Sequence, residues 1–153
     1  MAVPLRPGVV TWLGLRPARL VPIVECEAIA LSPGQGVTGD HYASATQGAR
    51  QVTVISAEHL TAIASYLGQD SVLPESLRRN VVVRGINLAA LKGRRFRLGS
   101  ALLESSGDCH PCSKMERLLG AGGYNAVRGH GGITARVLEG GEVRLGDAIS
   151  AVD

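Results

Sequence analysis

Short apolar runs rich in β-branched residues recur along the chain, and glycine, proline or polar turn residues separate them. Apolar runs of about four to eight residues between turn signals are typical of strands. The pattern therefore predicts a β-rich fold, mainly β with a few short helices. The expected strands are Gly8–Leu15, Ile23–Leu31, Gln51–Ile55, Asn80–Arg84, Arg95–Leu98, Ala101–Glu104, Thr134–Leu138 and Asp147–Val152.

One turn and three helical segments complete the predicted elements. The pair Gly140-Gly141 predicts a two-residue hairpin turn, because glycine supplies the positive φ that such turns require. Apolar residues at 60, 63, 64 and 67 have helical spacing, so Ser56–Leu67 is expected to be the longest helix, capped by its serine and stopped by Gly68. A shorter helix is expected from Pro111 to the residue before Gly120, and one helical turn within Leu73–Leu77.

Composition fits one globular domain over residues 1–153, because the chain of 15.9 kDa is 45% hydrophobic and 19% charged. Aromatic residues make up only 3% and the net charge is +3, so binding to nucleic acid is not expected. No apolar run reaches the length of a membrane span. Three cysteines, an odd number at uneven spacing, fit a reducing compartment, so we expect a cytoplasmic protein.

The motif Cys109-His110-Pro111-Cys112 carries the first candidate chemistry. Cys112 falls in the first turn of the helix expected from Pro111, where backbone N–H groups and the helix dipole favour a thiolate. A thioredoxin-like pair would follow an early strand of a βαβ unit, and a structural zinc ion would need four ligands, whereas only His130 follows; both are disfavoured. Two alternatives stay open: a functional thiolate, or two small apolar side chains in the core, which suits Cys109 better than Cys112.

Two basic segments are candidate anion sites. The loop Arg128-Gly129-His130-Gly131-Gly132 combines cations with glycines that let backbone N–H groups approach a ligand, although glycines also mark ordinary turns. The segment Arg78-Arg79-Asn80 brings a rigid guanidinium fork to the start of a strand, where it binds phosphate or lies in solvent. We expect Arg78, Arg79, Arg128 and His130 to approach one pocket.

Two weaker candidates remain. In Gly39-Asp40-His41 the carboxylate of Asp40 can orient the imidazole of His41 or cap a turn, and the turn is the commoner role. The basic residues Lys92, Arg94, Arg95 and Arg97 are read as an exposed turn and one strand face.

Taken in order, several segments resemble the MOSC domain, the module named after the C-terminal part of molybdenum-cofactor sulfurases. The resemblance runs from about Gly8 to the C-terminus and depends on the order of the segments, because no single one is specific. The segments are Gly39-Asp40-His41, Arg50 to Ile55, Arg79 to Gly85, Leu98-Gly99, Cys109 to Glu116, Gly131-Gly132-Ile133 and Gly146-Asp147.

The resemblance implies a MOSC-type β-barrel that binds the molybdenum cofactor, a phosphorylated pterin (molybdopterin) whose dithiolene holds the metal. It implies that Cys112 is a metal ligand or persulfide carrier, with Cys109, His130 and Asp40 as further catalytic candidates. The cofactor would contact Arg78, Arg79, Asn80, Arg128, His130, Gly131 and His41. Larger relatives add a pyridoxal-phosphate domain, for which this chain is too short, so no pyridoxal phosphate is expected in it.

The resemblance leaves the reaction open. The chain is expected to reduce N-hydroxylated compounds or to relay sulfur to the cofactor through Cys112, with a small-molecule substrate and a redox or sulfur-donor protein as partners. The alternative is a non-catalytic persulfide carrier that binds no metal. Among the cysteines, Cys112 is expected to be the functional thiol, Cys109 a secondary one and Cys26 a buried bystander in a strand.

Overall fold

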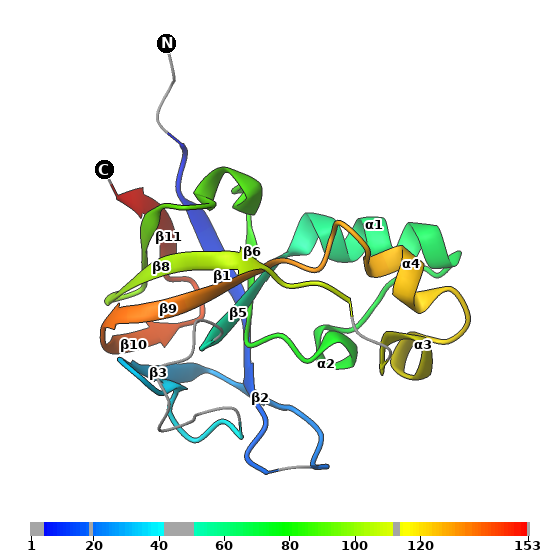
Figure 1. The fold of residues 1–153 in the computed structure, drawn as a ribbon, viewed down its shortest axis with the longest axis horizontal. Coiled ribbons are helices and arrows are strands. Elements are labelled where there is room, and N and C mark those ends of the chain that lie inside the picture. Colours follow the sequence, from blue (N-terminus) through cyan, green and yellow to red (C-terminus); the bar gives the residue numbers. More distant parts are fainter. Residues whose placement is uncertain (1–4, 19, 42–50, 112–113, 153) are drawn as a thin grey trace.

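The computed structural model describes residues 5–18, 20–41, 51–111 and 114–152. Its main feature is a β-barrel, drawn on the left of Figure 1, with the α-helices gathered at one end. The strands of the main sheet are β1 (Gly8–Leu15), β2 (Val24–Cys26), β5 (Val52–Ser56), β6 (Val81–Arg84), β7 (Arg95–Leu98), β8 (Ala101–Asp108), β9 (Ile133–Glu139) and β11 (Ala148–Val152). The predicted β-rich fold is confirmed.

The barrel closes between the two ends of the chain. The strand order is β11-β7-β8-β9-β5-β6-β1-β2, and β11 also pairs with β1, so that Gly8 lies opposite Ile149. Within the described residues this closes seven strands into a ring and leaves β2 attached outside it. Closure removes the open sheet edges that would otherwise invite pairing with other chains.

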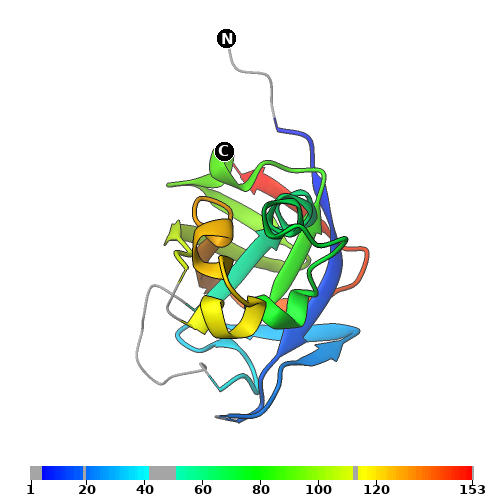
Figure 2. The same cartoon turned by 90° about the vertical axis from the view of Figure 1, so that its right-hand side faces the viewer.

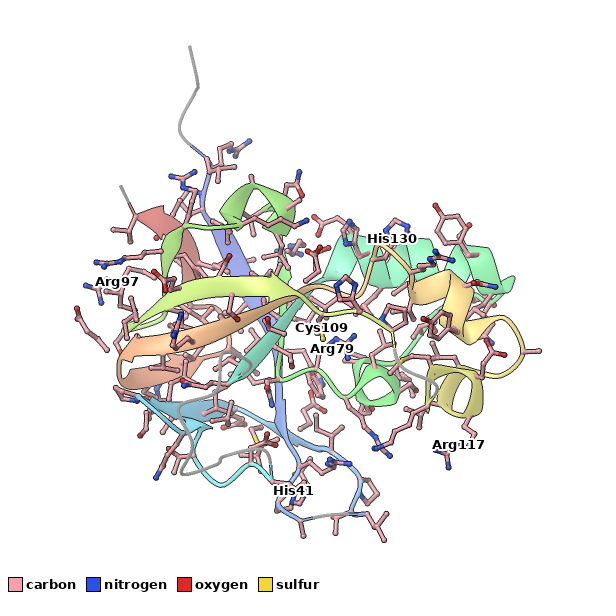
Figure 3. All side chains as sticks on the ribbon, in the orientation of Figure 1. His41, Arg79, Arg97, Cys109, Arg117 and His130 are labelled. Carbon is pink, nitrogen blue, oxygen red and sulfur yellow. The ribbon has the colours of Figure 1, made fainter. Side chains whose placement is uncertain are left out.

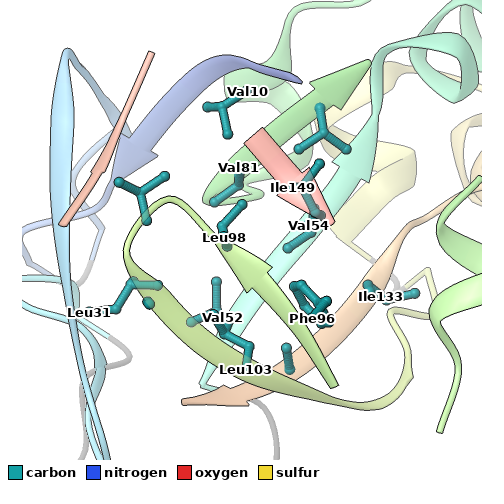
Figure 4. Close-up of a cluster of buried hydrophobic side chains, with 14 of the residues drawn as sticks. Val10, Leu31, Val52, Val54, Val81, Phe96, Leu98, Leu103, Ile133 and Ile149 are labelled. Carbon is teal, nitrogen blue, oxygen red and sulfur yellow. The ribbon is translucent and has the colours of Figure 1, made fainter. Parts of the chain in front are cut away.

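Two hydrophobic clusters hold the fold together. One fills the barrel and includes Val54, Phe96 and Ile149, all fully buried (Figure 4). The other lies between the barrel and the helices and includes Ile55 and Ile63. Neighbouring residues of β5 therefore serve opposite faces, which explains why this strand is apolar almost throughout.

Helix α1 (Ala57–Leu67) connects β5 to β6, a parallel pair that needs such a crossover. Its predicted boundaries are confirmed. The Oγ of Ser56 accepts a hydrogen bond from the backbone N–H of His59 at 3.1 Å, and Gly68 ends the helix with a left-handed φ of 69°. The shorter helices are α2 (Pro74–Leu77), the 3₁₀ helix η1 (Leu88–Leu91), α3 (Lys114–Leu119) and α4 (Gly123–Val127). Figure 2 shows α1, α2, α3 and α4 facing the viewer in front of the barrel.

A second, small sheet corrects two predictions. Its strands are β3 (Ala28–Ser32), β4 (Gly36–Val37) and β10 (Gly141–Arg144), in the order β10-β3-β4. The predicted strand Ile23–Leu31 is divided at Glu27, because β2 pairs with β1 and β3 pairs with β10. The predicted hairpin at Gly140-Gly141 is wrong: β10 leaves β9 and pairs with β3.

None of the helices in the described part of the chain has the length and apolar character that crossing a bilayer requires.

Candidate functional site

A cavity of about 340 Å³ opens between the barrel and helices α2 and α3. Several of the candidate site residues line it. Its lining combines cations, amides and a thiol with apolar side chains. The lining residues are Arg16, Ile23, Asp40, Gln51, Thr53, Leu77, Arg78, Arg79, Asn80, Cys109, His110, Lys114, Met115 and Leu118.

Arg79 lies at the wall of this cavity, 5% exposed. Its Nε donates to the carbonyl oxygen of Gly131 and its Nη1 to that of Leu77, both at 2.8 Å. Hydrogen bonds from a cationic donor are stronger than neutral ones. Arg79 therefore ties the turn after α2 to the loop before β9, and its charge faces the cavity from a fixed position (Figure 3).

Arg78 precedes it in the left-handed conformation, with φ of 56°. This conformation is unfavourable for a residue with a Cβ. It allows consecutive arginines to take different roles: Arg79 is buried, whereas Arg78 is half-buried at the cavity.

Asn80 connects three strands through its side-chain amide. Its Oδ1 accepts from the backbone N–H and the Oγ1 of Thr53, both at 3.1 Å, and its Nδ2 donates to the carbonyl of Gly14 at 3.3 Å. The amide is thus used to join β1, β5 and the start of β6. Gln51 lines the same wall, with its Oε1 accepting from the N–H of Val137 at 3.0 Å.

Asp40 lines the cavity, and hydrogen bonds hold its segment against Arg16. An Oδ1 of Asp40 accepts from the backbone N–H of Arg16 at 2.7 Å, and the N–H of His41 donates to the carbonyl of Arg16 at 2.6 Å. Asp40 lines the cavity, whereas His41 is exposed and is not part of the lining. The carboxylate of Asp40 therefore holds the segment at Arg16 in place.

The cysteines occupy three different settings. Cys109, 5% exposed, follows β8 and lines the cavity, and its N–H donates to the carbonyl of Gly132 at 2.9 Å. Cys112 lies outside the described residues, between Pro111 and Lys114. Cys26 lies in β2 as predicted, but it is half-buried rather than buried, because β2 is attached outside the closed barrel.

The glycine-rich loop before β9 does not bring Arg128 or His130 to the cavity lining. It turns two carbonyl oxygens inward, to Arg79 and to Cys109, so Gly131 is buried and serves as an acceptor rather than an anion-binding donor. Arg128 is exposed. The expected common pocket therefore holds for Arg78 and Arg79 only.

His130 instead packs against helix α1. Its ring lies 5.0 Å from that of His59 and 5.4 Å from that of Tyr66, measured between centroids. Burial and the neighbouring His130 lower the pKa of His59, against the opposing influence of Glu58. This histidine pair was not predicted from the sequence.

The cavity has the character of a site for an anionic, partly apolar ligand. Its lining includes the cations Arg16, Arg78, Arg79 and Lys114, and one carboxylate, that of Asp40. The Nε2 of Gln51, a hydrogen-bond donor at the wall, is buried with no partner among the described residues. Donors, cations and apolar walls suit a phosphorylated pterin, so the residues present fit the cofactor that the sequence implies.

We next consider which side chains of the protein could bind a metal ion. Within the described ranges, no group of three or more His, Cys, Asp or Glu side chains is arranged to hold a metal ion. A metal supplied by a cofactor needs fewer ligands from the protein, and Cys112, the cysteine implied for that role, lies outside these ranges.

A family profile, that of the MOSC domain, matches residues 34–150. The chain belongs to the MOSC domain family. The match covers the barrel strands from β5 onward, the whole helical end and most of the cavity lining. A search of curated protein sequences gave no match.

Solved structures show the same MOSC fold. The YuaD protein from Bacillus subtilis superposes with a TM-score of 0.85 at 22% identity, covering 96% of each chain. YiiM from Geobacillus stearothermophilus gives a TM-score of 0.73 at 17% identity over 95% of this chain and 75% of its own. YiiM from Escherichia coli gives 0.69 at 19% identity over 99% and 71%. At these identities the likeness establishes the fold.

Sequence reasoning missed three polar residues of the lining: Arg16, Gln51 and Thr53. Gln51 and Thr53 carried a usable signal, since they are the alternate polar positions of an otherwise apolar strand. Arg16 carried none, because the turn that brings it to Asp40 depends on contacts between distant segments.

Proposed function

We propose that this MOSC domain binds the molybdenum cofactor in the cavity between the barrel and α2 and α3, and acts there as a cytoplasmic oxidoreductase on N-hydroxylated small molecules. The cation-lined cavity with one carboxylate in its lining is the observation that carries the proposal. A phosphorylated pterin brings negative charge and hydrogen-bonding ring atoms, and both find partners in this lining.

Different residues of the cavity lining would provide the charged, polar and apolar contacts to the cofactor. Arg78 and Arg79 supply positive charge, Gln51 a free amide donor, and Met115 and Leu118 an apolar wall for the ring. Cys112 is proposed as the thiolate ligand of the metal, a role taken from the family resemblance. When bound, the cofactor would supply a metal that passes two electrons from the redox partner protein to the substrate.

The cavity also offers a protein-side proton donor. His110 is exposed and lines the cavity beside Cys109. Reduction of an N-hydroxylated compound to the amine and water takes up two protons, and an imidazole group can donate a proton. We propose that His110 delivers one of these protons to the leaving oxygen.

The deciding experiment is molybdenum and pterin analysis of the chain purified from a host that makes the cofactor. Stoichiometric molybdenum is expected in the wild type, none in Cys112→Ser, a partial loss in Cys109→Ser and no change in Cys26→Ser. Full molybdenum retention and activity in Cys112→Ser would contradict the proposed ligand. Absence of molybdenum from the wild type, together with a persulfide mass adduct on Cys112, would replace this function by a sulfur-carrier role.

A further inference from the structure

A second, smaller hollow of about 180 Å³ adjoins the cavity on its outer side. We call it the outer hollow; its lining is Leu20, Arg78, Lys114, Arg117 and Leu118. Three of these residues, Arg78, Lys114 and Leu118, also line the cavity, so the two spaces are contiguous. We infer that the outer hollow binds a phosphate group carried by the substrate that reaches the cofactor in the cavity.

Charge is the first argument. Three of the five lining residues are cations and none is a carboxylate. Of the ion pairs and side-chain hydrogen bonds within the described ranges, none engages Arg78, Lys114 or Arg117. Like charges gathered around one concave space repel each other, and a bound dianion removes that repulsion.

Helix α3 shows that this charge is not placed for the stability of the helix. Lys114 lies in its first turn, where the helix dipole disfavours a cation. Lys114 and Arg117 are three residues apart and so occupy neighbouring positions on one face, with Leu118 beside them. The acid of the same helix, Glu116, is used elsewhere: its two carboxylate oxygens accept from the N–H groups of Gly122 and Tyr124 at 3.1 and 2.8 Å.

Arg78 is the third cation of the outer hollow, and its backbone conformation is unfavourable. Its left-handed φ of 56° is rare and unfavourable for a residue with a Cβ. Arg79 cannot take its place, because two of the donors of that guanidinium are held by backbone carbonyls. The outward-facing charge at this end of the cavity therefore depends on Arg78, Lys114 and Arg117.

The position of the hollow favours the substrate as the source of the phosphate. The polar residues of the inner wall, Thr53, Asn80 and Cys109, belong to the cavity alone, whereas the outer hollow is bordered by Leu20, which is 88% exposed. A substrate that enters from solvent through the outer hollow and reaches the cofactor in the cavity leaves its phosphate among these cations. This inference rests on the proposed function for the identity of the substrate, but the anion site itself can be tested without the cofactor.

The test is calorimetric titration of the purified full chain with inorganic pyrophosphate at low salt. The wild type is expected to bind, and the double variant Lys114→Ala, Arg117→Ala is expected to bind at least about tenfold more weakly. Arg97→Ala is the matched control, since Arg97 is an exposed arginine at the opposite end of the molecule (Figure 3). Thermal unfolding of each variant confirms that it is folded. Absence of binding in the wild type, or equal binding in the double variant and the control, overturns the inference.

A second titration identifies the source of the phosphate. In protein that carries the molybdenum cofactor, a site meant for the substrate stays available and binds pyrophosphate as before. A site filled by the cofactor's own phosphate no longer binds it, and the assignment to substrate is then wrong. Protein that binds pyrophosphate through these residues but never carries molybdenum would defeat the proposed function and leave the anion site standing.

Discussion

Replacement of Gly131 by alanine tests the contact that joins the glycine-rich loop to the cavity wall. A Cβ on Gly131 would lie 2.1 Å from the carbonyl oxygen of Cys109 and 3.2 Å from a guanidinium nitrogen of Arg79. The first atom belongs to the backbone, so no side-chain rotation relieves the clash. The loop must move away from Cys109.

That movement threatens two hydrogen bonds. The bond from Arg79 Nε to the carbonyl of Gly131 has a charged donor and is worth about 1.5–3 kcal/mol. The backbone bond from Cys109 to Gly132 is worth about 1 kcal/mol. We expect Gly131→Ala to lower the free energy of unfolding by about 3 kcal/mol if both are lost, which shifts Tm by about 6–12 °C in a domain of this size.

Gly129→Ala is the matched control in the same loop. Gly129 has a left-handed φ of 81°, but a Cβ there meets nothing within 4 Å. Only the conformational cost of about 1–2 kcal/mol applies. Urea unfolding of both variants compares the free energy lost to the steric clash at Gly131 with that lost to the left-handed backbone at Gly129. If Gly131→Ala is no less stable than Gly129→Ala, the loop does not pack against Cys109 as described.

A double-mutant cycle separates the hydrogen bond from the clash. Arg79→Met removes the donor to Gly131 without adding an atom to the loop. Because one hydrogen bond can be lost only once, the double variant Arg79→Met, Gly131→Ala is expected to be less destabilised than the two single effects together. Strict additivity would show that the clash acts independently of Arg79.

Three further predictions concern α1 and the cysteines. Ser56→Ala is expected to lower the free energy of unfolding by about 1 kcal/mol through loss of the helix cap, whereas Ser65→Ala, at an exposed position of the same helix, leaves urea unfolding nearly unchanged. Burial and the neighbouring imidazole lower the pKa of His59 below the ordinary histidine value of about 6.5. Just below pH 6.5 the unfolded chain therefore binds more protons than the folded chain. The contribution of His59 to stability is fully present above pH 6.5 and is lost as the pH falls through the folded pKa. His59→Gln should remove part of that loss in Tm between pH 7 and pH 5, which lie above and below this ordinary value, and an unchanged pH profile would contradict the assignment. Cys26, half-buried in an outer strand, should be alkylated faster than the buried Cys109 in mass-spectrometric time courses, and the reverse order would contradict the burial described here.

Local sequence signals predicted the elements of the barrel but not its closure. Strands β1 and β11 pair across almost the whole chain, with Val9 opposite Ala148. Nothing in the alternation of either strand specifies its neighbour, because pairing is settled by which faces can be buried together. The same reason explains the error at Ile23–Leu31, where one apolar run serves two sheets.

Glycine positions predicted turns poorly, because glycine occurs both where the backbone has a positive φ and where two segments pack closely. At Gly68 and Gly120 it supplies a left-handed turn, as expected at helix ends. At Gly140 and Gly141 neither residue has a positive φ; a Cβ would meet the carbonyl of Leu31 at 2.7 Å or Ser100 Oγ at 2.4 Å. These glycines permit close approach of two sheets, and the predicted hairpin confused that role with a turn.

The segment Arg78-Arg79-Asn80 shows why a candidate site can be located from sequence while the roles within it cannot. All three residues line the cavity, as the basic pair before a strand suggested. Yet Asn80 joins strands and Arg79 holds the Gly131 loop, and both are buried. Of the three, only Arg78, which has a left-handed backbone, is partly exposed and lines both the cavity and the outer hollow. Buried groups that are held by several hydrogen bonds respond little to a ligand. We therefore expect the exposed side chains that line the outer hollow to determine which anions bind there. Substitutions at Arg117 should therefore change which anions bind without changing stability, whereas substitutions at Arg79 should lower stability.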